Sequence, residues 1–220
     1  MIAPSEKSKS AVTTTPLLDE FRPLWRIAWP ILIAQTAQMG TGVVDTLMAG
    51  NYGDTDLAAI AVGFNIWLPL YLIILGTLFA CSAIVAQDYG AERVERVRSF
   101  LPQSLWVAIV LSAVMTPLCL NSSAIIELLG LPTDTAERAA AYVSRVGLGF
   151  PALGIFMALR YHTQGLGITA PFAAASVLGF IANVPLNYML IFGHWGAPEL
   201  GAEGCGLATA ASMWISTAII

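Results

Sequence analysis

The stretch from Ile27 to Gly50 is long enough to cross a lipid bilayer as a helix, and Asp45 is its only ionisable residue. A carboxylate within a membrane span costs about 2.5–3.5 kcal/mol on insertion scales. Such a residue therefore faces protein or water and usually handles an ion, a proton or a ligand. Asp45 is thus the residue whose role most needs an explanation.

The composition indicates an all-α integral membrane protein, because 57% of the residues are hydrophobic and 11% are charged. A soluble domain has about 25% charged residues. Residues 1–23 are polar and lack the apolar core of a signal peptide, so we expect a cytosolic tail followed by a membrane domain over 24–220. The net charge of −4 argues against nucleic acid as a partner. We expect the acidic residues outside the spans to be solvated loop charges.

Apolar runs bounded by Gly, Pro and charged residues predict six helices, of which the sixth is incomplete. Their expected ranges are 27–49, 59–86, 102–120, 139–159, 171–192 and 204 to the end. Pro69 is expected to kink the second helix. Most aromatic residues, including Trp67 and Trp106, are expected to face lipid or the protein core.

The cysteines and histidines form no pattern that predicts a metal site or a disulfide. Cys81, Cys119 and Cys205 are scattered and are expected to be small buried side chains. His162 and His194 are expected in connecting segments, and neither has a partner at metal-ligand spacing.

The basic residues predict the orientation of the helices in the membrane. Arg138 and Arg145 lie at the start of the fourth expected helix, on one side of the membrane. The other basic residues lie on the opposite side: Lys7, Lys9, Arg22, Arg26, Arg93, Arg96, Arg98 and Arg160. The positive-inside rule then places the N-terminus in the cytoplasm and Asp45 towards the exterior.

Helical spacing places Gln35, Gln38, Thr41 and Asp45 along one side of the first helix. This polar stripe either lines a substrate pathway or joins helices by hydrogen bonds. On the fifth helix, Asn183 and Asn187 share one face. Pro185 lies between them and frees the carbonyl of Ile181.

Two roles are open for the pair Asn183 and Asn187: they either bind a cation or join helices. Thr209 on the sixth helix either joins this polar group or bonds the carbonyl four residues before it.

Several segments, in order along the chain, resemble the multidrug and toxic compound extrusion (MATE) family, in its NorM-like bacterial branch. They are PILIAQTAQMGTGVVDTLMAG at 30–50, AQDYGAERVERVRS at 86–99 and GFIANVPLNYMLIFGHWGAPELGAEGCGLATA at 179–210. The N-x-P-x-N core and the loop that follows it are the most specific of these motifs. The resemblance extends from about Leu24 to the end of the chain.

The resemblance implies a twelve-helix transporter made of two six-helix lobes, of which this chain matches the first. It implies export of amphipathic cationic drugs across the bacterial inner membrane, driven by influx of Na⁺ or H⁺ and without a cofactor. We expect this chain to be a fragment, with the second lobe supplied by the rest of the protein.

The same resemblance assigns roles to four residues. Asp45 matches an aspartate tied to coupling-ion or proton binding, while Asn183 and Thr209 match members of the same polar cluster. Asn187 stands where some branches carry a second aspartate, which leaves a sodium site with less compensating charge. The coupling ion therefore stays open between Na⁺ and H⁺.

Other function classes fit the sequence less well. A lipid-linked saccharide flippase of similar architecture would need several cations for its pyrophosphate, and only Arg138, Arg145 and Arg160 approach a span, near its ends. A membrane-embedded enzyme would need a nucleophile with its base or a motif such as HExxH, and neither appears. A purely structural scaffold would have no use for Asp45.

Overall fold

The computed structural model describes the backbone of residues 17–220 and side chains from residue 24 onward. The helices are α1 (Leu17–Tyr52), α2 (Asp54–Gly90), α3 (Val94–Leu120), α4 (Ser123–Glu127), α5 (Thr133–Gly147), α6 (Phe150–Gly165), α7 (Ala170–Phe192), the short 3₁₀ helix η1 (His194–Gly196) and α8 (Ala202–Ile219). This described part contains no strand. The predicted polar tail, residues 1–23, lies largely outside the described residues. Helix α1 begins at Leu17, which is within the range expected for the tail.

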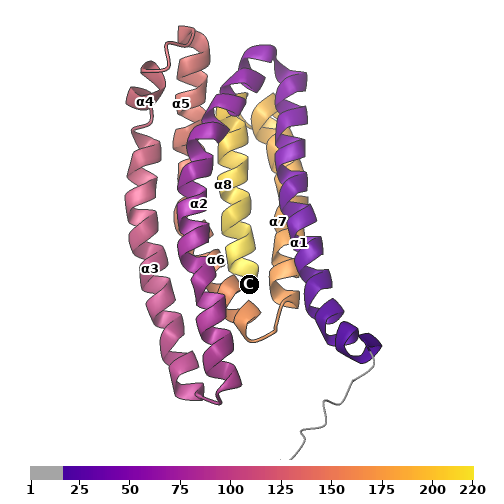
Figure 1. The fold of residues 1–220 in the computed structure, drawn as a ribbon. Helices are drawn as coiled ribbons and strands as arrows, with labels where there is room; N and C mark the ends of the chain where they lie inside the picture. Colours follow the sequence, from indigo (N-terminus) through magenta and orange to yellow (C-terminus); the bar gives the residue numbers. More distant parts are fainter. Residues whose placement is uncertain (1–16) are drawn as a thin grey trace, which may run out of the picture.

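The long helices run side by side as one bundle (Figure 1). Helix α8 passes through the middle of the bundle and packs against α5 and α7, while α1 packs on α7 and α3 packs on α6. Large apolar side chains such as Phe79, Trp106 and Val110 are exposed on the outside of the bundle. An apolar exterior of this kind suits contact with lipid rather than water.

All six predicted helices are present, but the fourth differs from the prediction. Instead of one helix over 139–159, the structure has α5 and α6, which meet at a break and are bent by 45°. Pro151 in the first turn of α6 has no N–H to donate to the Gly147 carbonyl, so one helical hydrogen bond is missing at the break. The Thr116 hydroxyl lies 3.5 Å from that carbonyl and donates to it instead.

Helices α2, α3 and α7 are long and apolar enough to cross a membrane, and the bent pair α5–α6 passes the same test together. Within the described part of the chain, α1 and α8 do not meet this criterion. The first carries Gln35, Gln38, Thr41 and Asp45, and these polar side chains lower its hydropathy. The fold is thus an all-α membrane lobe in which the polar side chains of α1 lie at the cavity described below.

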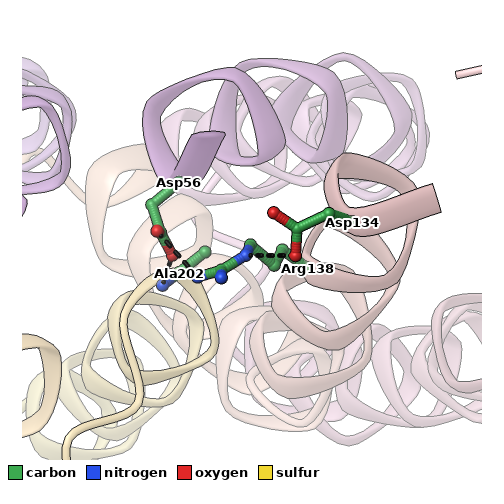
Figure 2. Close-up of polar contacts among 4 residues, drawn as sticks. All are labelled: Asp56, Asp134, Arg138 and Ala202. Atoms are coloured by element: carbon green, nitrogen blue, oxygen red, sulfur yellow. Dashed lines mark hydrogen bonds and ion pairs between the residues drawn. The ribbon is translucent and has the colours of Figure 1, made fainter. Parts of the chain in front are cut away.

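One buried carboxylate joins three helices at the end of the bundle where α2 begins (Figure 2). Asp56 on α2 is 4% exposed and accepts hydrogen bonds from Arg138 Nη1 of α5 at 2.9 Å and from the Ala202 backbone N–H of α8 at 2.7 Å. Arg138 also donates through Nε to Asp134 at 3.0 Å. The prediction that the acidic residues outside the spans are solvated loop charges is wrong for Asp56, and also for Asp88, which is buried near Arg93 and Arg96 at the other end of α2.

Candidate functional site

A cavity of about 890 Å³ opens into the bundle between α1, α2 and the helices α5 to α8. Its volume lies in the range of pockets that bind drug-sized molecules. Most of its wall is apolar. The polar stripe predicted on α1 lies along it, with Gln35 and Asp45 ten positions apart and therefore separated by about 15 Å along the helix.

Asp45 lies in the wall of this cavity and is held by two neutral donors. The side chain is 6% exposed. Asn187 Nδ2 of α7 donates to Asp45 Oδ1 at 2.5 Å, and Thr209 Oγ1 of α8 donates to Asp45 Oδ2 at 3.0 Å. Among the described residues, no Lys, Arg or His forms a salt bridge with this carboxylate. Its negative charge thus has hydrogen bonds but no countercharge.

The two asparagines form a buried amide pair next to Asp45. Asn183 and Asn187 have no exposed surface, and Asn187 Nδ2 also donates to Asn183 Oδ1 at 2.9 Å. The Oδ1 of Asn187 and the Nδ2 of Asn183 have no hydrogen-bond partner within the described structure. Carboxylate, amide and hydroxyl oxygens are the ligands that hard cations prefer. The cluster therefore has unused acceptor capacity beside an uncompensated charge.

The structure brings together all four residues that were predicted to form one site, Asp45, Asn183, Asn187 and Thr209. Thr209 donates to Asp45 across the helix interface and not to the carbonyl four residues before it. Gln35, Gln38 and Thr41 all line the cavity, although the Thr41 hydroxyl donates to the Ala37 carbonyl of its own helix.

Two residues, one beside Asp45 and one in the cavity wall, were not predicted as parts of the site. Cys205 is fully buried beside Asp45, and its position one turn before Thr209 on α8 was a usable signal. Trp67 packs against the core, as expected, but it also lines the cavity and stacks on Tyr71 with a centroid distance of 4.9 Å. The periodicity of apolar residues along a helix does not distinguish a cavity wall from a core, so no sequence signal indicated that Trp67 lines a cavity.

Two further expectations are corrected on α6. Arg160 and His162 were placed after the fourth helix or in a connecting segment, yet both lie inside α6 and are buried. Helix α6 continues to Gly165 because neighbouring helices cover its polar last turns. Across the described residues, no group of three or more His, Cys, Asp or Glu side chains is arranged to hold a metal ion.

Comparison with known proteins now identifies the family. The MatE family model matches residues 30–189. This chain belongs to the MatE family. The resemblance seen in the sequence motifs is therefore confirmed.

Similar MatE relatives include the probable multidrug resistance protein NorM of Acinetobacter baylyi, which is 37% identical over 89% of this chain and 44% of its own length. The multidrug resistance protein PmpM of Pseudomonas aeruginosa is 39% identical over 89% of this chain and 41% of its own length. The chain therefore spans less than half the length of these relatives. The eukaryotic MATE transporter AtDTX14 has a similar fold, with a TM-score of 0.83 and 18% identity over 92% of this chain and 44% of that one.

Proposed function

We propose that this chain is the first lobe of a multidrug efflux antiporter, a transporter rather than an enzyme, which exports amphipathic cations in exchange for Na⁺ or H⁺. The observation that carries the proposal is Asp45, an uncompensated carboxylate in the wall of a large cavity. The names of the multidrug resistance relatives support the same activity. The second lobe is expected in the rest of the protein.

The charge at Asp45 explains how one site serves both an ion and a drug. Asn187 and Thr209 donate hydrogen bonds but bring no positive charge. A buried carboxylate in this setting is stabilised by any cation that reaches it, whether a proton, Na⁺ or the amine of a drug. Because the carboxylate is one group, these cations compete for it, and competition at one site is the basis of exchange.

The rest of the cavity suits the apolar part of such substrates. Its wall includes several aromatic and methionine side chains: Phe64, Trp67, Tyr71, Phe156, Phe180, Met39, Met157 and Met213. Aromatic faces attract organic cations, and methionine adapts its shape to varied ligands. A lining of this kind favours breadth of substrates over strict selection.

We further propose a bacterial inner-membrane location with a cytoplasmic N-terminus. Of the ten basic residues, Arg138 and Arg145 lie at the end of the bundle where α2 begins, and Arg160 lies inside α6. The remaining basic residues lie before α1 or in its N-terminal part, or between the end of α2 and the first turns of α3. This asymmetry supports the proposed orientation by the positive-inside rule.

The flippase alternative has less support from the contacts. Arg138 pairs with Asp56, and Arg145 Nη2 lies 2.6 Å from Glu203, so both cations are already neutralised. The third arginine, Arg160, does not line the cavity, so a pyrophosphate would lack the several cations that charge complementarity requires.

The deciding experiment uses the complete gene product in inverted membrane vesicles. A proton gradient and a sodium gradient are imposed separately while uptake of a fluorescent cationic dye is followed. We expect uptake under one of the two gradients and none without a gradient, and the effective gradient identifies the coupling ion. Absence of dye movement under both gradients would contradict antiport and favour the flippase.

Thr209→Val should weaken ion coupling without removing it. The substitution keeps the side-chain shape but removes the donor to Asp45 Oδ2, and a hydrogen bond to a charged group contributes about 1.5–3 kcal/mol. We expect the ion concentration that gives half-maximal exchange to change at least several-fold. Thr36→Val is the matched control, because the Thr36 hydroxyl donates to its own helix at Leu32 and lies outside the cavity. An equal effect of both variants would argue against a role for Thr209.

A further inference from the structure

We infer that Gln35 and Arg160 form a second polar subsite, at the end of the cavity far from Asp45, that binds the carboxylate or another hydrogen-bond acceptor of a substrate. The acid group of a zwitterionic amphiphile would then bind at Gln35 while its amine binds at Asp45. This inference rests on the proposed export function and names the residues that select for an acid group.

Arg160 is a buried cation without a countercharge. It lies inside α6, is 6% exposed, and forms no salt bridge within the described part of the chain. Its guanidinium lies over the Phe172 ring at 3.9 Å from the centroid, and Nη1 lies 3.8 Å from the Met157 sulfur. Its Nε has no hydrogen-bond partner in the described structure.

A lone arginine at this depth is costly, and such residues are kept for function. The contacts around Arg160 hold the guanidinium in place but do not neutralise it. Its positive charge is therefore not balanced by any carboxylate among the described residues.

Arg160 also fixes which end of the Gln35 amide faces the cavity. Its Nη2 donates to Gln35 Oε1 at 3.2 Å. A guanidinium has donors only, so the atom of Gln35 that faces it must be the oxygen. The Nε2 amino group, with two N–H donors, is thus left for the cavity that Gln35 lines.

The neighbouring glutamine is oriented in the opposite way. Gln38 donates through Nε2 to the Ser176 hydroxyl at 3.5 Å, which leaves its oxygen as the free end. Gln35 is therefore the position at this end of α1 where N–H donors backed by a positive charge meet the cavity. Donors with a cation behind them are the usual partners of a carboxylate.

The carboxylate of Asp45 and the amide of Gln35 lie at the two ends of the cavity, at a distance that suits a drug-sized zwitterion. Asp45 and Gln35 are ten positions apart on α1, which corresponds to about 15 Å. Arg160 does not line the cavity but donates to Gln35, so it acts through the amide as a positioning residue. A molecule with an amine and an acid at its opposite ends would be aligned along α1.

The test compares two xanthene dyes that differ in one group: a cationic dye with a free benzoate and its methyl ester. Both are offered to inverted vesicles that hold the complete gene product, and the ratio of acid-dye to ester-dye uptake is measured. In Gln35→Met and in Arg160→Met, we expect this ratio to fall about 10-fold, equivalent to about 1.4 kcal/mol, while ester uptake continues.

Gln164→Met is the matched control, because it removes an amide from α6 that does not line the cavity, and its ratio should equal that of the wild type. Gln35→Met alone decides the matter if Arg160→Met does not accumulate. An unchanged ratio, or parallel loss of both dyes, overturns the inference. Ester uptake without acid uptake in the wild type also overturns it, whereas absence of gradient-driven ester uptake contradicts the proposed function itself.

Discussion

Asp45→Asn will reduce gradient-driven dye export to the level of vesicles that lack the protein. An asparagine carries no charge and takes up no proton in the physiological range, so neither an ion nor a cationic drug gains electrostatic energy by binding to it. The amide has nearly the same shape as the carboxylate and can still accept the hydrogen bond that Asn187 donates. Loss of transport should therefore occur without loss of the fold.

The stability of the same variant separates a coupling role from a structural one. Burying a charge without a countercharge is costly, so removal of the Asp45 charge should leave the melting temperature in detergent unchanged or raise it. Asp54→Asn makes the same chemical change at an exposed position of α2 and should leave both transport and melting temperature near wild type. Export that persists in Asp45→Asn would show that coupling depends on another residue.

Asp56→Ala will have the largest effect on stability, lowering the free energy of unfolding by about 2–4 kcal/mol. The substitution leaves the Arg138 guanidinium and the Ala202 N–H without their acceptor, and removal of one partner of a buried pair costs about 3–5 kcal/mol. Arg138 is 41% exposed and can recover some hydration, which reduces the expected cost. Denaturant titration in mixed micelles measures the difference.

Asp134→Ala provides the control at the same arginine. Asp134 is 64% exposed and pairs with Arg138 one helical turn away, so its loss should cost about 0.3–0.5 kcal/mol. Equal destabilisation by the two variants would mean that the junction of α2, α5 and α8 contributes nothing beyond an ordinary surface ion pair.

Much of the architecture could be predicted from the sequence because apolar runs bounded by Gly, Pro and charges are strong signals for membrane helices. The break between α5 and α6 could not be seen in this way, since the apolar run continues across it. Its local cause, Pro151 after two glycines, was present in the sequence. Arg160 was misplaced because a charged residue was taken as the mark of a helix end, whereas aromatic neighbours and Gln35 keep it inside α6.

The candidate site was predictable to the extent that it follows helical spacing. The i, i+4 pair Asn183 and Asn187 meets Asp45 because α7 packs directly on α1. The burial of Asp56 depends instead on its contacts with Arg138 and with the start of α8. These residues are far from Asp56 in the sequence, and no local sequence pattern predicts such contacts. Tertiary contacts likewise decided that the Thr209 hydroxyl bonds Asp45 in preference to its own helix.

Asp45 is the only carboxylate among the described residues that line the cavity, so the proposed exchange would involve one negative charge at this lobe. A monovalent cationic drug replaced there by one Na⁺ or H⁺ moves no net charge, so the membrane voltage does not act on that cycle. A zwitterion replaced by one such ion carries one positive charge inward per turnover. The voltage then contributes about 2.3 kcal/mol for every 100 mV. Export of the cationic drug would thus depend on the ion concentration difference alone, whereas export of the zwitterion would also depend on the membrane voltage.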